Sequence, residues 1–325
     1  MAYGPDTAKL LRRIEEYCSE TKHQERNAGV EEAFALDLAL LDVHSLPDLR
    51  ALPPIKTLRC YNTNLRSLPP FPEMLEQLYC GPVESPVLPE LPSTLQVLFI
   101  GTSGLSTLPD PLPPCLKQLS LWKTSVTTLP PLPSTLEHLS IDQSPISVIP
   151  PLPPSLLYLS CKYTNVSVIP ALPTGLLRLE CDSNPQITHL PRLPPSLKGL
   201  WCRGTNVTDL PSLPSSLEEL MCNETNVRVL PDLPPLLFRT HPLDIYGVLG
   251  RLHFDRYSHP SLERGIDESF QDFVLRWNNW YSKERTQKRT SLVAEDLIAA
   301  TWHPDRFEQW CLDEEEKKEN EEMCA

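Results

Sequence analysis

The segment IPPLPPSLLYLSCKYTNVSV, residues 149–168, recurs with small changes along most of the chain. Related copies read LPPLPSTLEHLSIDQSPISV from Leu129 and LPSLPSSLEELMCNETNVRV from Leu210. The Leu-Pro or Ile-Pro pair that opens each copy begins at Leu46, Leu68, Leu88, Leu108, Leu129, Ile149, Ile169, Leu190, Leu210 and Leu230, so the period is 20–22 residues. A fixed period of this length predicts a solenoid, in which every repeat packs only against its neighbours.

Each part of the repeat favours a particular backbone. In the pattern Leu156-x-x-Leu159-x-Cys161 the last two apolar residues are two apart, as in a strand, so Tyr158 and Ser160 should point to the opposite face. The Leu-Pro-x-Leu-Pro segment lacks two amide donors and favours an extended, polyproline II path. We therefore predict a leucine-rich-repeat solenoid of about ten repeats, with a concave parallel β-sheet and an extended convex side whose leucines turn inward.

One column of the repeat is polar and lies where the strand should end. It holds Thr63, Ser103, Thr124, Ser144, Thr164, Asn184, Thr205 and Thr225, which we expect to bond backbone groups left unpaired by the turn. Two copies carry one extra residue, near Asp110-Pro111 and near Pro185-Gln186, and we expect bulges on the rim there.

Six cysteines share one core position: Cys60, Cys80, Cys161, Cys181, Cys202 and Cys222. Other copies hold Ile100, Leu121 and Ile141 there, so the position favours a compact apolar group, and unpaired cysteine behaves as one. Disulfides or a structural metal are the alternative. Stacked strands would place neighbouring cysteines about 4.8 Å apart, but with parallel side chains, which is poor disulfide geometry.

Composition limits the classes of partner. The formal charge of −13 argues against a general nucleic-acid binder and against an anionic membrane surface. The N-terminus has no apolar run of signal-peptide length, and no segment approaches the roughly 20 apolar residues of a membrane span. We expect a cytoplasmic protein that uses neither a cofactor nor a metal, since His241, His253, His259 and His303 lack the paired spacing of a zinc site.

The two ends differ from the repeats. Residues 1–32 should form a helical N-terminal cap, with a helix over residues 6–20 whose inner face holds Leu10, Leu11, Ile14, Tyr17 and Cys18. The solenoid should cover residues 33–236. Residues 237–325 are predicted to be an α-helical capping or adaptor region with an acidic tail. Its longest apolar stripe holds Ile266, Phe270, Phe273, Val274, Trp277, Trp280 and Tyr281.

The residues that alternate with the core should line the concave face. The predicted partner-binding set is Tyr61, Tyr79, Phe99, Trp122, Lys123, His138, Asp142, Tyr158, Lys162, Tyr163, Arg178, Glu180, Asp182, Trp201 and Arg203. Seven of these are Tyr, Trp or Phe, and Tyr, Trp and Arg dominate the energetics of protein interfaces. The alternative is that the aromatic side chains only stabilise the sheet across strands. We expect a protein or peptide ligand.

Residues 46–236 resemble the short leucine-rich repeats of bacterial effector proteins of the YopM and IpaH type, which carry the same Leu-Pro-x-Leu-Pro signature. The resemblance implies a non-catalytic recognition surface for host proteins. Cys311-Leu312-Asp313 has the C-x-D form of the ubiquitin-ligase domain of IpaH-type effectors, which implies an alternative: a substrate-recognition subunit for ubiquitination, through a recruited ligase or through Cys311. Cys311 lies on the apolar side of its predicted helix, where a thiol is inert.

The C-terminal motif W-H-P-D-R-F-x-x-W-C is similar to C-terminal segments of proteins from large nucleocytoplasmic DNA viruses. This second resemblance implies a viral protein that acts in the host cytoplasm, and it implies nothing about mechanism.

Overall fold

The computed structural model describes residues 4–24, 34–222, 224–227, 231 and 234. The predicted C-terminal helices, Cys311, the four histidines considered for zinc and the WHPDRF motif all lie outside the described residues. The boundaries drawn at residues 32 and 236 therefore stay predictions.

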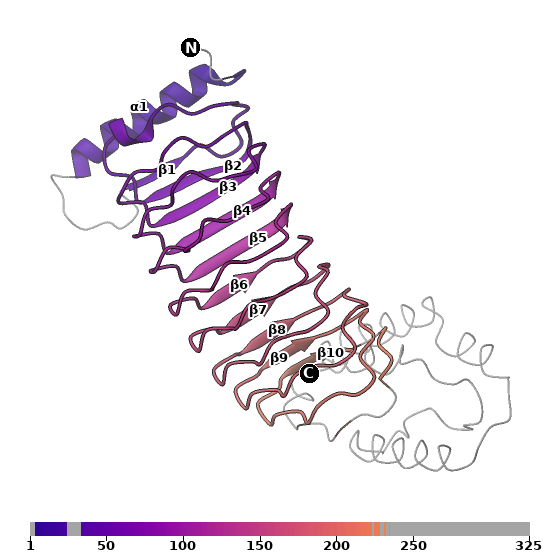
Figure 1. The fold of residues 1–325 in the computed structure, drawn as a ribbon. Coiled ribbons are helices and arrows are strands. Elements are labelled where there is room, and N and C mark those ends of the chain that lie inside the picture. The colour runs from indigo at the N-terminus through magenta and orange to yellow at the C-terminus, as the bar shows by residue number, and fades with distance from the viewer. Residues whose placement is uncertain (1–3, 25–33, 223, 228–230, 232–233, 235–325) are drawn as a thin grey trace, which may run out of the picture.

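The described chain is a stack of coils that contributes one strand per coil to a single parallel sheet (Figure 1). The strands are β1 (Ala35–Asp37), β2 (Thr57–Leu65), β3 (Gln77–Val83), β4 (Val97–Ser103), β5 (Gln118–Thr124), β6 (His138–Ser140), β7 (Tyr158–Ser160), β8 (Arg178–Glu180), β9 (Gly199–Trp201) and β10 (Glu219–Met221). They pair strictly in chain order, and all nine pairs are parallel. The predicted leucine-rich-repeat solenoid is confirmed.

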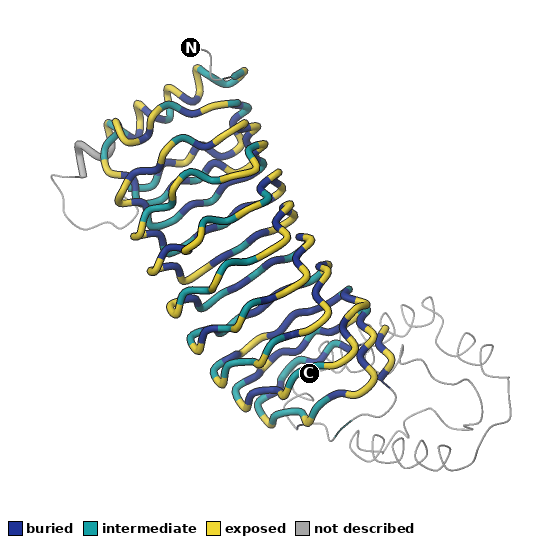
Figure 2. The backbone as a smooth tube through the Cα atoms, viewed as in Figure 1, coloured by how far each residue is buried: buried dark blue, intermediate teal, exposed yellow. Residues whose placement is uncertain are grey.

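The register of the sheet follows the leucine column. Leu139 pairs with Leu159, and Leu159 with Leu179, so the same core position of each repeat stacks on the next. All three side chains are fully buried. Figure 2 shows that buried residues recur along every coil, as this stacking requires. The core is one continuous column along the axis of the solenoid.

The proline-rich side of each coil has no regular secondary structure, apart from a short 3-10 helix, η2 (Leu49–Ala51), and it contains a tight turn. In the repeat at residues 149–168 the N–H of Leu156 donates to the carbonyl of Pro153 at 3.1 Å, and the equivalent bond recurs in neighbouring repeats. The preceding leucines turn inward, since Leu112 and Leu193 are buried and Leu152 packs against the core. The second proline of the signature therefore begins the turn that returns the chain to the sheet.

A helix, α1 (Thr7–Gln24), packs against β1 at the N-terminal end of the sheet (Figure 1). Leu10, Ile14 and Tyr17 are buried, whereas Leu11 is 45% exposed. The prediction that Leu11 faces inward is wrong, because a residue next to Leu10 lies about 100° around the helix. Arg13 donates from Nη1 to the carbonyls of Asp37 at 3.1 Å and Ala39 at 2.9 Å, so the helix satisfies backbone acceptors at the first strand.

The polar column after each strand behaves as expected. The hydroxyls of Thr63, Thr164 and Thr205 each donate to the carbonyl three residues earlier, at 2.7–2.9 Å. Asn184 does more, because its amide donates to the carbonyls of Cys161, Cys181 and Asp182. These bonds satisfy acceptors inside the coil, where water does not reach.

The six core cysteines are fully buried, and all are free thiols. The interpretation as compact core residues is thus confirmed. Burial raises the pKa values of the Cys161, Cys181 and Cys202 thiols well above the usual range for cysteine, and it raises the pKa of Cys222 to about 12. The thiols therefore stay neutral at physiological pH and are poor nucleophiles.

The two insertions do not form bulges in the sheet. Asp110 and Pro111 are exposed on the proline-rich side, far along the coil from the strands. Pro185 and Gln186 widen the turn that follows β8, where the N–H of Ile187 donates to the carbonyl of Asn184 at 3.1 Å. The expected rim position is therefore wrong for the first insertion. The irregular register lies elsewhere, between β2 and β3, where Tyr61 pairs with Gly81 but Leu65 pairs with Val83.

Candidate functional site

The concave face is the side of the sheet opposite the core, formed by the residues that alternate with the buried leucine and cysteine columns. In β3, for example, Tyr79 faces outward between the buried Leu78 and Cys80. The face divides into two halves of different chemistry, one over β2–β5 and one over β6–β10.

The first half carries an aromatic patch, which we define as Tyr61, Tyr79, Phe99 and Trp122, one residue on each of the four strands β2–β5. The rings of Tyr79 and Phe99 lie 6.4 Å apart at a tilt of 34°, a cross-strand aromatic pair. Tyr61 is 37% exposed and Trp122 is 41% exposed. The patch therefore combines a packed centre with two rings that present much of their surface outward.

Two glycines make room for the patch. A Cβ on Gly101 would lie 3.3 Å from the ring of Phe99 and 3.5 Å from that of Trp122, so both rings rest close to the bare backbone. Gly81 has φ +133°, and a Cβ there would overlap the backbone of Gly101. Sequence reasoning missed these glycines. The available signal was glycine two residues after an aromatic residue in adjacent repeats, Tyr79-x-Gly81 and Phe99-x-Gly101.

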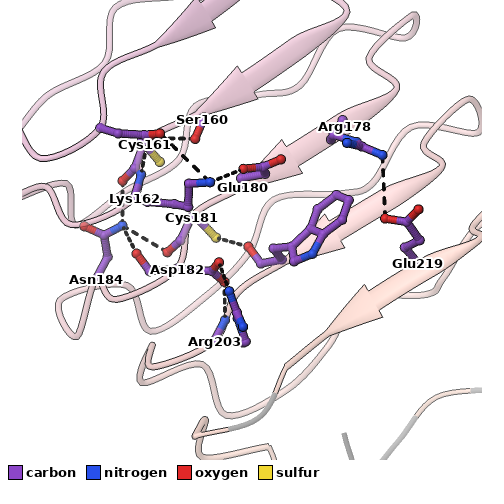
Figure 3. Close-up of polar contacts among 12 residues, drawn as sticks. Ser160, Cys161, Lys162, Arg178, Glu180, Cys181, Asp182, Asn184, Arg203 and Glu219 are labelled. Atoms are coloured by element: carbon purple, nitrogen blue, oxygen red, sulfur yellow. Dashed lines mark hydrogen bonds and ion pairs between the residues drawn. The ribbon is translucent and has the colours of Figure 1, made fainter. Parts of the chain in front are cut away.

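The second half is dominated by charges that pair with one another (Figure 3). Lys162 forms an ion pair with Glu180, and its Nζ also lies 4.0 Å from Asp142 Oδ2. Asp142 Oδ1 accepts from Ser160 Oγ at 2.7 Å and from the backbone N–H of Lys162 at 2.8 Å. Burial lowers the pKa of Lys162, but its hydrogen bond to Glu180 and the charges of Glu180 and Asp142 outweigh that effect and raise the pKa overall.

Further along, Arg178 bridges two strands. Its guanidinium lies 4.6 Å from the ring centroid of Trp201 and its Nη2 lies 3.6 Å from Glu219 Oε2. Trp201 in turn covers Gly199, because a Cβ at that glycine would lie 2.3 Å from the indole. Asp182, which is 4% exposed, accepts from both the backbone and the guanidinium of Arg203. The side chains in this half thus satisfy one another.

Lys123 and Tyr163 occupy a special backbone position at the end of the strand. Their φ angles are +55° and +54°, and Gly204 has φ +63° at the equivalent place four repeats after Lys123. The N–H of Lys123 donates to the carbonyl of Asp142 at 2.9 Å, and that of Tyr163 to the carbonyl of Asp182 at 3.0 Å. Both side chains are exposed. Lys123 is thus the next-to-last residue of β5 and Tyr163 lies after β7, so both border the concave face where the chain turns.

His138 and Tyr158 complete the predicted set. Their rings lie 5.9 Å apart on β6 and β7, and both are half-buried. Burial and the charge of Glu180 raise the pKa of Tyr158 above its usual value. All fifteen predicted residues thus lie on the concave face or at its turn edge, and their role in binding stays a prediction.

In the part of the chain that the structure describes, no group of three His, Cys, Asp or Glu residues is placed to hold a metal ion. The same part of the chain has no helix of the length and hydropathy that a membrane crossing requires.

Comparison with solved structures places this geometry among known solenoids. YopM from Yersinia enterocolitica WA-314 superimposes with a TM-score of 0.59 and 31% sequence identity, over 69% of this chain and 53% of that one. The fold is similar to that of YopM. The Yersinia pestis YopM, described as a leucine-rich effector protein, gives the same TM-score and identity over 62% of this chain and 57% of that one.

A Shigella effector leucine-rich-repeat domain aligns at 26% identity over 59% of this chain and 71% of that one, with a TM-score of 0.41. No protein-family model and no curated protein matches the chain. The chain spans little more than half the length of the two YopM structures. The similarity to YopM supports the solenoid and a resemblance to effector-type leucine-rich repeats.

Proposed function

We propose that the protein is a non-catalytic recognition module that binds a protein or peptide partner on its concave face, with the aromatic patch as the main contact. The exposure of Trp122 and Tyr61 carries this proposal. Large aromatic side chains that only stabilised the sheet would bury their surface against neighbouring strands, as Tyr79 and Phe99 partly do. Exposed Trp and Tyr side chains are typical of the energetic centres of interfaces.

The similarity to YopM supports the same proposal, because leucine-rich repeats of that effector type are protein-interaction modules. A role in ubiquitination through Cys311 or a recruited ligase concerns residues outside the described part of the chain, and it stays a prediction. So do the viral origin and the cytoplasmic location.

Affinity capture with quantitative mass spectrometry tests the proposal. The bait proteins are the wild type, a Phe99→Ser/Trp122→Ser variant, and a control variant, Val148→Ser/Val168→Ser. The control removes apolar side chains that are 69% and 70% exposed but lie after the turn, away from the sheet. All baits are first checked for equal melting temperatures.

We expect the patch variant to lose partners that the wild type and the control retain. Partners shared by all three baits, or lost equally from both variants, would show that the concave face is not the site.

A further inference from the structure

The cations of the concave face differ in whether a carboxylate neutralises them. In the half over β6–β10, Lys162, Arg178 and Arg203 each form an ion pair with an acidic side chain of a neighbouring repeat or the next but one. In the aromatic half, Arg59 and Lys123 form no ion pair with any residue that the structure describes. Arg59 instead lies over the ring of Tyr79, 5.9 Å from its centroid.

The strands beneath the aromatic patch contain no acidic residue. The sequences of β2, β3, β4 and β5 are TLRCYNTNL, QLYCGPV, VLFIGTS and QLSLWKT, without Asp or Glu. This is notable in a chain with 42 acidic residues against 29 Lys and Arg. The strands of the aromatic half thus carry Arg59 and Lys123 without an acid of their own; the acid next to them is Asp37 on β1, the register partner of Arg59, which lies 3.9 Å from Arg13.

Lys123 is also held in a backbone conformation that favours glycine. Its φ of +55° lies in the left-handed region, where a Cβ crowds the following carbonyl. Glycine is compatible with this position, because Gly204 occupies it in a later repeat. Gln143 and Tyr163 hold the same conformation in the next two repeats, so the backbone does not single out Lys123. The position does hold the Lys123 side chain exposed at the edge of the aromatic half, without an ion pair within the described chain, which points to an external use of its charge.

We infer that the aromatic patch, Arg59 and Lys123 together bind an extended acidic segment of the partner, an inference that rests on the proposed function. Carboxylates of the segment pair with Arg59 and Lys123, and its apolar side chains pack on Phe99 and Trp122. A guanidinium is well suited to a carboxylate because it donates two parallel hydrogen bonds.

The spacing of the two cations predicts the spacing of the ligand's acids. Arg59 lies on β2 and Lys123 at the end of β5, so they are separated by three strand intervals. At about 4.8 Å per interval this is roughly 14 Å across the sheet, and Lys123 lies three residues, about 10 Å, further along the strand than Ser120, the register equivalent of Arg59. The direct separation is therefore about 17 Å, which an extended peptide covers in about five residues. The predicted ligand has two Asp or Glu residues about five positions apart, with aromatic or aliphatic residues between them.

Selection of a displayed library of random dodecapeptides on the full-length protein tests this inference. We expect enriched peptides to contain the predicted acidic pair. A fluorescein-labelled peptide of the enriched consensus is then titrated by fluorescence anisotropy. Arg59→Gln should weaken its binding on the order of tenfold, Lys123→Gln by about threefold, and added salt should weaken binding to the wild type.

Two further variants separate the possible outcomes. Lys117→Gln removes an exposed lysine that precedes β5 and should leave binding unchanged. Lys123→Gly should weaken binding without lowering the melting temperature, since glycine relaxes the left-handed backbone. A drop in melting temperature would instead make Lys123 a structural residue and contradict the inference.

The remaining results distinguish this inference from the proposed function. Neutral or basic consensus peptides, no enrichment at all, or binding that depends on Trp122 but not on Arg59 and Lys123, would overturn the acidic ligand and leave the patch as a candidate surface. Enriched peptides whose binding survives Trp122→Ala would overturn both.

Discussion

Asp182 and Arg203 are joined twice across adjacent repeats. One carboxylate oxygen of Asp182 accepts from the backbone N–H of Arg203 at 2.8 Å, and the other accepts from its guanidinium at 3.0 Å. The carboxylate is buried and the arginine is half exposed. The pair therefore fixes the backbone of one repeat to the side chain of the previous one.

Replacement of Asp182 by Ala should lower the free energy of unfolding by about 2 kcal/mol, because it leaves a part-buried backbone N–H and a guanidinium without their acceptor. Urea titration followed by circular dichroism measures the loss. Glu84→Ala is the matched control, since Glu84 is an exposed acid in the turn after β3. Equal losses in the two variants would show that the Asp182 contacts are not stabilising.

Asn184 links two repeats through its side-chain amide. It donates to three carbonyls, and its Oδ1 accepts from the N–H of Thr164 at 2.9 Å and lies 2.9 Å from the Thr164 hydroxyl, whose single hydrogen it shares with the carbonyl of Cys161. Asn184→Ala should therefore cost about 3 kcal/mol of stability, because several buried groups lose their partner. Asn184→Thr should cost clearly less, since threonine fills this position in other repeats and donates to the same kind of carbonyl. Chemical denaturation of both variants provides the comparison, and an Ala variant as stable as the Thr variant would argue against it.

Leu159 lies at the centre of the leucine column and is fully buried between Leu139 and Leu179. Leu159→Asp should cost more than about 4 kcal/mol and unfold much of the array, because it places an unpaired carboxylate in the core. Val168→Asp introduces the same charge at a residue that is 70% exposed and should change the melting temperature little. Thermal melts of the two proteins are compared, and an unchanged melt for Leu159→Asp is incompatible with the observed register.

The buried cysteines predict a loss of stability in alkaline solution. In the folded state burial raises the pKa of Cys161 and raises that of Cys222 to about 12. In the unfolded chain a thiol ionises near pH 8.5. Above that pH the unfolded state loses protons that the folded state keeps, so the free energy of unfolding falls as pH rises.

This loss should begin near pH 8.5 and continue toward pH 12, by up to about 1.4 kcal/mol per pH unit for each thiol. Urea titrations at pH 7.5, 9 and 10 measure it. Cys161→Val should reduce the slope while conserving an apolar group, as Ile141 does one repeat earlier. A slope identical to that of the wild type would show that ionisation of this thiol does not contribute.

Much of this fold could be predicted from the period alone. Leucines spaced by the repeat can only be buried by stacking, so strand order, parallel pairing and the core columns follow from the sequence. The free, buried cysteines also follow, because isoleucine and leucine replace them in other repeats. The sequence predicts the wrong side of α1 for Leu11. Its residue type does not distinguish an exposed leucine next to the buried stripe from a leucine within that stripe.

The candidate site was less predictable. Alternation places Lys162, Glu180 and Asp182 on the concave face, but it does not show that they pair with residues of neighbouring repeats. That pairing depends on cross-strand register and side-chain reach. The left-handed backbone of Lys123 and Tyr163 was also missed, because Leu40, Asn62, Thr102, Gln143, Ser183 and Glu224 share the conformation without sharing a residue type. Gly204 and Asn62 are the residues of that column whose types favour the left-handed conformation.

The ion pairs of the second half join residues from different coils: Lys162 reaches Glu180, Asp182 reaches Arg203, and Arg178 reaches Glu219. The repeats have equivalent leucine positions. Each of these repeats, however, supplies only one member of an ion pair, and a different repeat supplies the other. Deleting, duplicating or moving one repeat would preserve the backbone register of the sheet. It would, however, leave charged side chains on the concave face without their partners. The order of the repeats is thus itself encoded, coil by coil, in the concave surface.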